Sequence, residues 1–364
     1  MAERLPRRVG VIFGGQSGEH EVSVVSAQYV MAAARDRFQV MPIGVTRTGA
    51  WLTPEETERQ LEREDAAFHK TLELPGAGEP ALSGAKGLLS RPEALASLRE
   101  IDVAFPLIHG PFGEDGTLQG LLALAGVPYV GAGVAASAIG MDKALMKRIF
   151  RQAGLDVVDH LVVRLSEYKA GAREIGDAVE ASIGYPAFVK PANGGSSVGI
   201  SKVRSREDLG PAVCLAFRYD RKLLVERAVE AREVECAVLG NDDPKASPLG
   251  EIRYTREFYD YEAKYLDPGT QLIVPAELPQ ETAQRIQELA VRGYRAIDCA
   301  GMGRMDFFLA QDGQVYIDEI NTVPGFTPGS MYPLLWQHAG LSYGDLIGRL
   351  VELALERHKE RVRG

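Results

Sequence analysis

Hydrophobic positions in the first part of the chain alternate between short unbroken runs and a helical period. Residues 9–13 form a β-branched run ending in Gly14 and Gly15, a pattern typical of a buried parallel strand that leads into a loop. Further strands are predicted at residues 38–45, 103–108 and 127–130, and a helix at 117–125. Apolar residues at helical spacing after the first loop are Val22, Val25, Ala27, Val30 and Ala33. The pattern predicts an open α/β domain over residues 1–132.

The pattern weakens over residues 54–99. Acidic and basic residues crowd its first part, and the Pro- and Gly-rich stretch 75–80 interrupts any periodicity. We interpret this segment as an insertion at the surface of the first domain.

Two further units follow. A helix starting at Gly133 and strands at 187–190 and 198–203, which flank a glycine-rich loop, predict a central domain over 133–228. That domain continues with a helix at 207–217 and a strand at 223–226. From about residue 229 strands alternate with loops, and the chain closes on an amphipathic helix with Ser342 as a plausible N-cap. The third predicted domain is therefore 229–364.

Composition limits the classes of function. The chain has 364 residues, of which 45% are hydrophobic and 25% charged, as is ordinary for a soluble globular protein. Its net charge of −9 (41 basic against 50 acidic residues) offers no general attraction for a nucleic-acid backbone. No apolar run is long enough for a signal peptide or a membrane span. These features predict a cytoplasmic protein that binds neither nucleic acid nor membrane.

The three cysteines are widely separated. Cys214, Cys236 and Cys299 have no C-x-x-C spacing, which argues against both a disulfide framework and a thiolate metal site. We interpret them as small core residues in a reducing compartment.

The segment 303–321 is the most informative of the chain. Asp312-Gly313 between two β-type runs predicts a hairpin with a two-residue turn. That register sets Asp306 opposite Glu319 and Arg304 opposite Asn321, with all four side chains on one face. Nearer the turn it pairs Ala310 with Val315 and Phe308 with Ile317.

Opposed carboxylates on this hairpin need a counter-charge. Like charges facing each other across two strands destabilise the pair, and the cost is larger when they are partly buried. A divalent cation resolves the conflict. Because the carboxylates of Asp306 and Glu319 and the amide of Asn321 offer oxygen ligands, Mg²⁺ or Mn²⁺ suits the site better than zinc. The alternative is an exposed acidic face on which Arg304 is the neutralising partner.

The loop 190–199 is rich in glycine and serine. Glycines let main-chain N–H groups approach a phosphate, and hydroxyls add further donors. The loop lacks the G-x-x-x-x-G-K-[ST] pattern, and Gly14, Gly15 and Gly18 lack the spacing of G-x-G-x-x-G. By itself such a loop is more often a flexible turn. Next to a metal-binding hairpin, a cover for nucleotide phosphates is the better interpretation.

Ordered motifs occur along nearly the whole chain, in the runs 14–23, 109–110, 113–120, 141–143, 258–265 and 319–325. These motifs resemble those of D-alanine–D-alanine ligases. Residues 54–99 fall outside the resemblance. Arg227 stands where the family pattern has Lys, a departure that affects only adenine contacts.

The resemblance implies a fold and a reaction. The fold would be ATP-grasp, with three α/β or α+β domains and ATP, the co-substrate, between the second and third. ATP would phosphorylate the carboxylate of one D-alanine, and the amine of a second would attack the resulting D-alanyl phosphate. Two Mg²⁺ (or Mn²⁺) ions, a homodimer and a place in peptidoglycan precursor synthesis are implied as well.

The resemblance also implies residue roles. ATP would be bound by Lys143, Lys190, Glu226, Arg227, Val229, Glu233 and Lys264. The metal ligands would be Asp306, Glu319 and Asn321. Catalytic roles would fall to Glu19 (ammonium of the first substrate), Ser196 (loop closure), Tyr265 (enclosure of the acceptor), and Arg304 with the Gly325 N–H (oxyanion). His109 would lie near the first substrate, and Ser330 with Met331 would bind the carboxylate of the second.

Several alternatives stay open from the sequence. The tyrosine-rich segment 257–269 suits an aromatic lid over a water-sensitive acyl phosphate, but its tyrosines could instead form a packed edge strand. His109 could be a structural loop residue, and Glu19 could complement a helix dipole. A D-alanine–D-lactate ligase or another ATP-grasp carboxylate–amine ligase is the nearest rival. A silent nucleotide-binding regulator would have no need of the Arg304/Asp306/Glu319/Asn321 face.

Overall fold

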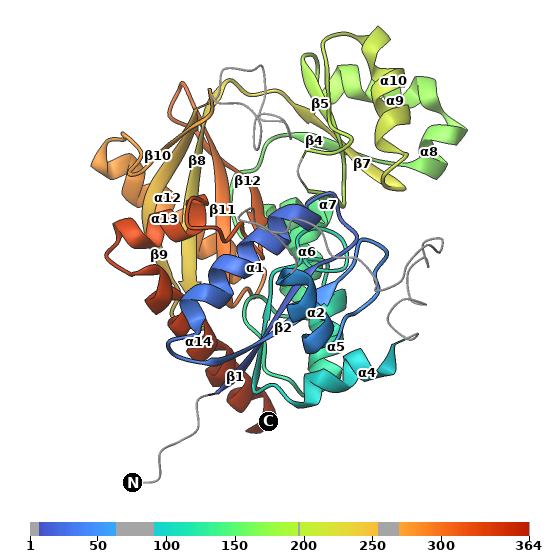
Figure 1. The fold of residues 1–364 in the computed structure, drawn as a ribbon. Helices are drawn as coiled ribbons and strands as arrows, with labels where there is room; N and C mark the ends of the chain where they lie inside the picture. The colour runs from blue at the N-terminus through green and yellow to red at the C-terminus, as the bar shows by residue number, and fades with distance from the viewer. Residues whose placement is uncertain (1–6, 63–90, 196, 254–268, 364) are drawn as a thin grey trace.

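Three β-sheets organise the computed structural model, which describes residues 7–62, 91–195, 197–253 and 269–363. A small parallel sheet lies near the N-terminus, and two antiparallel sheets follow in the sequence (Figure 1). The four-stranded sheet and its helices form a lobe of their own, apart from the five-stranded sheet (Figure 1). The predicted mixture of an α/β part and α+β parts is confirmed.

The N-terminal sheet has the order β2-β1-β3, from β1 (Arg8–Gly14), β2 (Gln39–Val45) and β3 (Val103–Pro106). Both neighbours pair with β1 in parallel, so its apolar run is buried on both faces, as predicted. The helices of this part are α1 (His20–Ala34), α2 (Pro54–Leu61), α4 (Pro92–Ala96), η1 (Ser97–Arg99) and α5 (Thr117–Leu124).

The predicted strand at 127–130 is wrong. Only an isolated parallel bridge joins Ala104 to Tyr129. Pro128 has no N–H to donate, and Gly131, with φ of 91°, turns the chain away just afterwards. The segment therefore lacks the main-chain N–H donors that a further strand of the sheet would need.

The central sheet has the order β4-β7-β5-β6, with all neighbours antiparallel. Its strands are β4 (His160–Arg164), β5 (Ala187–Pro191), β6 (Ser201–Val203) and β7 (Lys222–Arg227). The helices α8 (Leu165–Ala170), α9 (Ala172–Ser182) and α10 (Arg206–Ala216) belong to the same lobe (Figure 1).

The helix expected from Gly133 is two helices, α6 (Val134–Met141) and α7 (Lys143–Gln152). Asp142 lies between them in an extended conformation and caps α7. Its carboxylate accepts hydrogen bonds from the N–H groups of Ala144 and Leu145, each at 3.1 Å. This cap fixes the first turn of α7, where Lys143 lies.

The C-terminal sheet has the order β10-β9-β8-β11-β12. Its strands are β8 (Ala231–Gly240), β9 (Lys245–Arg253), β10 (Gln271–Ile273), β11 (Gly301–Ala310) and β12 (Val315–Asn321). In the described part of this unit the helices are α12 (Gln280–Ala296), α13 (Met331–His338) and α14 (Tyr343–Arg363).

The expectation that only strands and loops precede the last helix is wrong. The 17-residue α12 buries Ile286, Ala290, Gly293 and Tyr294 at helical spacing. The predicted cap of the last helix is confirmed, since the Asp345 N–H donates to the Ser342 hydroxyl at 3.2 Å.

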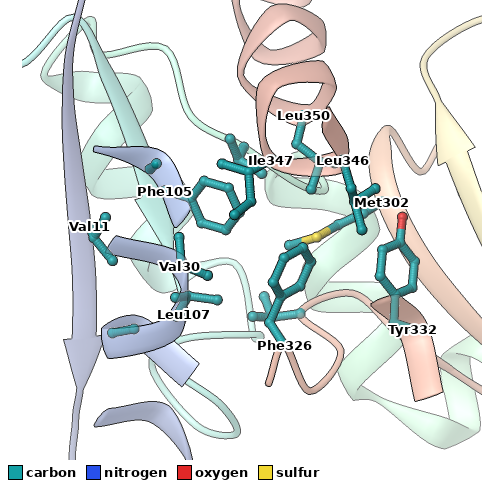
Figure 2. Packing of buried hydrophobic residues seen from close by; sticks show 14 of the residues in the cluster. Val11, Val30, Phe105, Leu107, Met302, Phe326, Tyr332, Leu346, Ile347 and Leu350 are labelled. Atoms are coloured by element: carbon teal, nitrogen blue, oxygen red, sulfur yellow. The ribbon is translucent and has the colours of Figure 1, made fainter. Parts of the chain in front are cut away.

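The largest core cluster joins the N-terminal sheet to the C-terminal unit. Val11 and Phe105 of the first sheet share this cluster with Ile347 and Leu350 of α14 and with Phe326 (Figure 2). The ring centroids of Phe105 and Phe326 lie 5.6 Å apart in an edge-on arrangement. Buried apolar area thus holds the two units in contact.

The cysteine interpretation is right for two of the three residues. Cys236 and Cys299 are buried, whereas Cys214 on α10 is exposed. None of the described helices is long and apolar enough to cross a membrane.

Candidate active site

A cleft of about 660 Å³ opens between the central and C-terminal sheets. Phe188, Glu226 and Pro191 come from the central sheet, and Phe308 comes from the C-terminal sheet. The cleft combines apolar surface with many charged groups. Of the predicted site residues, it is lined by Lys143, Lys190, Glu226, Arg227, Val229, Glu233, Arg304, Asp306 and Glu319.

The β11–β12 hairpin brings the predicted face together, but through a different turn. Arg304 pairs with Asn321 and Asp306 with Glu319, as predicted. Nearer the turn the prediction is wrong by one residue, because Leu309 faces Val315 and Phe307 faces Ile317.

A longer loop explains the difference in register. The Ala310 N–H donates to the main-chain carbonyl oxygen of Gln314 at 2.9 Å, so residues 311–313 form the connection. Gly313 in this loop adopts φ of 85°. A bulge at Asp306/Phe307, opposite Asp318, restores the register. The bulge leaves Asp318 as an extra residue beside Glu319.

The acidic face is neutralised by Arg304. Its Nε and Nη2 donate to the two oxygens of Asp306, each at 2.8 Å, and its Nε lies 3.1 Å from Glu235 Oε2. Burial opposes the charge of Arg304, but Asp306 and Glu235 outweigh it and raise its pKa well above the ordinary value. The ion pair that the alternative interpretation assumed, with Arg304 neutralising the acidic face, is therefore present in the structure. Arg304 and Asp306 are only partly exposed, and together with Glu319 they line the cleft.

Lysines face the other carboxylates. Lys143 Nζ lies 2.7 Å from Glu319 Oε2, and Lys190 Nζ lies 2.6 Å from Glu226 Oε1. Burial disfavours both ammonium groups, yet the neighbouring carboxylates prevail and raise the pKa of each. Both lysines stay charged at neutral pH.

Three charged residues of this site were missed as site residues. Lys147 lies one helical turn after Lys143 and contacts Glu226 and Asp318. Burial raises the pKa of Asp318, but Lys190 and Lys147 reverse the effect and lower it well below the usual range. Glu235 follows Glu233 at strand period, a signal that could have identified it. The spacing of Lys147 was a usable signal too, whereas Asp318 depends on the bulge.

The donor set fits a hard divalent cation. Asp306 and Glu319 are cross-strand neighbours, and Asn321 Nδ2 lies 2.8 Å from Asp306 Oδ2. Cations already compensate both carboxylates, since Arg304 pairs with Asp306 and Lys143 with Glu319. Within the described residues there is no group of three His, Cys, Asp or Glu side chains around one point. A metal here would be held by the two carboxylates with the Asn321 amide, all oxygen ligands.

Hydrogen bonds hold the start of the glycine-rich loop in place. Asn193 donates from its N–H (2.9 Å) and its side-chain amide (2.8 Å) to Asp220. Gly194 accepts a hydrogen bond from Lys143 Nζ at 3.1 Å, which ties the loop to the first turn of α7. Gly199 has φ of 76° and lies so close to Tyr219 that a Cβ would meet the ring at 2.5 Å, so only glycine fits.

His109 and Glu19 lie on the N-terminal side of the site. His109 is 4% exposed, and its Nδ1 lies 3.0 Å from the Val323 carbonyl oxygen, while its buried Nε2 has no hydrogen-bond partner among the described residues. Burial lowers its pKa, but Glu114 and Glu19 outweigh burial and raise it. Glu19 reaches the glycine-rich loop, since a Cβ on Gly195 would lie 3.5 Å from its Oε2.

The segment after β12 places three further predicted residues. A Cβ on Gly325 would lie 3.2 Å from Ser330 Oγ, so these two are neighbours. Ser330 precedes α13, and its hydroxyl lies 2.8 Å from that of Thr327. The Met331 side chain is 4% exposed and belongs to the core, so only its main chain could serve a ligand.

Arg227 lies 3.2 Å from Asp159 in an exposed ion pair. Ser196, Lys264, Tyr265 and the tyrosine-rich segment 257–268 lie outside the described residues, so their predicted roles stay predictions.

Two antiparallel sheets around a cleft of lysines and carboxylates, next to a parallel α/β unit, define an ATP-grasp ligase. Family models described as D-ala D-ala ligase N-terminus and C-terminus match residues 8–132 and 149–352. The chain therefore belongs to the D-alanine–D-alanine ligase family and is an enzyme of that activity, and the family implies D-alanine and ATP as substrates and a place in peptidoglycan synthesis.

Relatives match over nearly the whole chain. The D-alanine–D-alanine ligase of Geobacillus thermodenitrificans is 49% identical, with 97% of each chain covered. That of Acetivibrio thermocellus is 46% identical, with 98% of each covered. Among solved structures, the D-alanine–D-alanine ligase from Coxiella burnetii has a TM-score of 0.79 at 35% identity, covering 100% of this chain and 97% of its own. The VanG D-Ala:D-Ser ligase from Enterococcus faecalis has a TM-score of 0.78 at 34% identity, and the match covers 96% of this chain and 99% of its own.

Proposed function

We propose that the cleft joins two D-alanine molecules through a D-alanyl phosphate, with ATP as the phosphoryl donor. A carboxylate oxygen of the first D-alanine attacks the γ-phosphorus and ADP leaves. The amine of the second D-alanine, after losing a proton, then attacks the acyl carbon and inorganic phosphate leaves. The observation that carries the proposal is the placing of Lys143 and Lys190 opposite Asp306 and Glu319 in one cleft. Joining two anions requires such cations on one side and metal ligands on the other.

The metal would be held by Asp306, Glu319 and Asn321. When bound, Mg²⁺ (two ions, or Mn²⁺) would offset the charge that develops on the transferred phosphoryl group. The chain's own contribution is to position these ligands on one face of a hairpin whose register the bulge at Asp318 sets. On binding, the carboxylates would exchange part of their contact with Arg304 and Lys143 for the metal.

The nucleotide would lie along the central sheet. Lys143 and Lys190 would pair with phosphates, and the glycine-rich loop next to them, with Ser196, would cover these. Adenine and ribose would meet Glu226, Arg227, Val229 and Glu233, all of which line the cleft. Lys264 would approach the γ-phosphate.

The amino-acid substrates would lie between the cleft and the N-terminal unit. Glu19 would hold the ammonium of the first D-alanine, with His109 nearby. Ser330 and the Met331 N–H at the start of α13 would bind the carboxylate of the second, where the helix N-terminus favours an anion. Arg304 and the Gly325 N–H would stabilise the tetrahedral oxyanion, and Tyr265 would enclose the acceptor.

The three sheets support a division into domains at 1–132, 133–228 and 229–364. This division places the cleft between the second and third domains. A homodimer, which the family resemblance implies, and a cytoplasmic location, which the sequence features predict, complete the proposal.

The test is ADP release measured against D- and L-amino acids. With ATP, Mg²⁺ and D-alanine the protein should release ADP and phosphate and form a dipeptide, and L-alanine should support neither. D-serine and D-lactate offered as second substrates distinguish the related ligases, and we expect D-alanine to be preferred. Equal turnover of L-alanine, or AMP as product, would exclude the proposed reaction.

A further inference from the structure

Lys147 is a buried cation behind the cleft. It lies on α7 one turn after Lys143, and its side chain is 0% exposed. Its Nζ lies 2.9 Å from Glu226 Oε2, at ion-pair distance but without hydrogen-bond alignment, and donates to Asp318 Oδ1 at 3.3 Å. Lys147 does not line the cleft, so it has no direct contact to offer a nucleotide bound there.

Lys190 contacts the same two carboxylates from the cleft side. Its Nζ lies 2.6 Å from Glu226 Oε1 and 3.3 Å from Asp318 Oδ1. The two lysines and two carboxylates therefore form a closed ring with no net formal charge. The ring joins α7, β5 and β7 to β12, and it spans the central and C-terminal sheets. Of its two cations, only Lys190 lines the cleft.

We infer that Lys147 is a positioning residue for ATP binding: it holds Glu226 and Asp318 in place and compensates their charge when Lys190 turns to the phosphates. This inference rests on the proposed function, because it requires ATP in this cleft. Phosphate oxygens compete with Glu226 and Asp318 for Lys190, since all of them are anionic partners for one ammonium group.

A charge count shows what Lys147 contributes. Once Lys190 binds phosphate, the remaining members of the ring are Lys147 and the two carboxylates, and their net charge is −1. Without Lys147 the ring would be at −2, in a buried place beside an anionic triphosphate, and uncompensated buried charge is costly. Removing the charge of Asp318 as well would return the ring to −1. The loss at position 147 should therefore be recovered by a change at position 318.

The experiment measures ADP affinity by calorimetry together with the KM for ATP and kcat. Lys147→Met should weaken ADP binding and raise the KM for ATP roughly 10- to 100-fold, with kcat within about threefold of wild type. Lys147→Arg should restore part of the affinity, because it keeps the charge. Lys147→Met/Asp318→Asn should bind ADP within about fivefold of Asp318→Asn alone. Arg148→Gln, an exposed change on the same helix, should match wild type.

Three results would overturn the inference. These are unchanged ADP affinity in Lys147→Met, a fall in kcat at constant KM, or a double variant as weak as Lys147→Met. If Lys147→Met does not fold, the double variant takes its place, and weak ADP binding relative to Asp318→Asn then contradicts the inference. Failure of the proposed function is separate, because it would appear as a wild-type protein that releases no ADP with D-alanine.

Discussion

The two walls of the cleft carry opposite charge. Lys143 of α7 and Lys190 of β5 line one wall, with Lys147 buried behind them, whereas β12 contributes Asp318 and Glu319 to the other wall. Each lysine contacts at least one of these carboxylates, so the walls are joined by ion pairs rather than separated by them. The C-terminal wall also carries a cation of its own, Arg304, which pairs with carboxylates of the same sheet.

The difference assigns the walls different tasks. A lysine wall can exchange a carboxylate for a phosphate without changing its own protonation, since the pKa values of Lys143 and Lys190 are raised. A carboxylate wall can exchange an ammonium or guanidinium for a metal. Under the proposed function, substrate binding would be an exchange of ion-pair partners across a preformed cleft, with little reorganisation of the main chain.

The largest effect should follow from weakening the carboxylate wall. Asp306→Asn and Glu319→Gln should each lower kcat on the order of 1000-fold, because metal-held phosphate positioning supplies several kcal/mol at about 1.4 kcal/mol per tenfold. Steady-state kinetics with saturating ATP and Mg²⁺ measure this loss. Asp312→Asn, an exposed change in the same hairpin's loop, is the control and should retain full turnover.

An acidic face without a metal would behave in the opposite way. Removing one of two facing carboxylates would then raise the melting temperature and leave turnover intact. Melting curves of the same two variants distinguish the cases.

A smaller effect should follow from the lysine wall. Lys190→Met should lower kcat/KM for ATP roughly 100-fold, because one charge-assisted contact to phosphate is lost while Lys143 remains. The initial rate at low ATP measures it. Lys169→Met on α8 removes an exposed lysine of the same lobe and should change nothing. A Lys190→Met enzyme with wild-type kcat/KM would mean that ATP does not meet this wall.

The smallest effect concerns pH and the His109–Glu114 pair, which belongs to neither wall. Because neighbouring carboxylates raise the folded-state pKa of His109, its protonated form stabilises the fold. That contribution is complete below the unfolded pKa of about 6.5 and is lost as pH rises through the raised folded pKa. Burial raises the pKa of Glu114, which gives the same sign.

The melting temperature should therefore fall by about 2 °C more between pH 6 and pH 9 in wild type than in His109→Gln. Equal slopes in the two proteins would mean that His109 does not titrate in this range.

Much of this architecture follows from local sequence signals. The apolar run 9–13 gives a buried strand because parallel sheets are covered on both faces, and the facing of Asp306 and Glu319 follows from period two. The prediction of a two-residue turn failed because the three-residue loop and the bulge at Asp318 each shift the register by one, and the shifts cancel at the carboxylates. The two errors thus left the predicted facing of Asp306 and Glu319 intact.

Other features depend on tertiary contacts. Lys147 has no local sign of burial, since only the docking of β7 and β12 against α7 encloses it. Asp142 interrupts the helix predicted from Gly133 because its side chain caps α7, which pattern alone does not reveal. The helix α12 was missed although its apolar spacing is helical, and a count of matches to the helical period would have found it.

The most direct test of the account follows an oxygen atom. D-alanine labelled with ¹⁸O in both carboxylate oxygens is supplied with unlabelled ATP and Mg²⁺, and the phosphate released is analysed by mass spectrometry. If the cleft activates the carboxylate as an acyl phosphate, each phosphate released with a dipeptide carries one ¹⁸O, because attack by the amine breaks the acyl carbon–oxygen bond. Dipeptide formed with unlabelled phosphate would contradict the account.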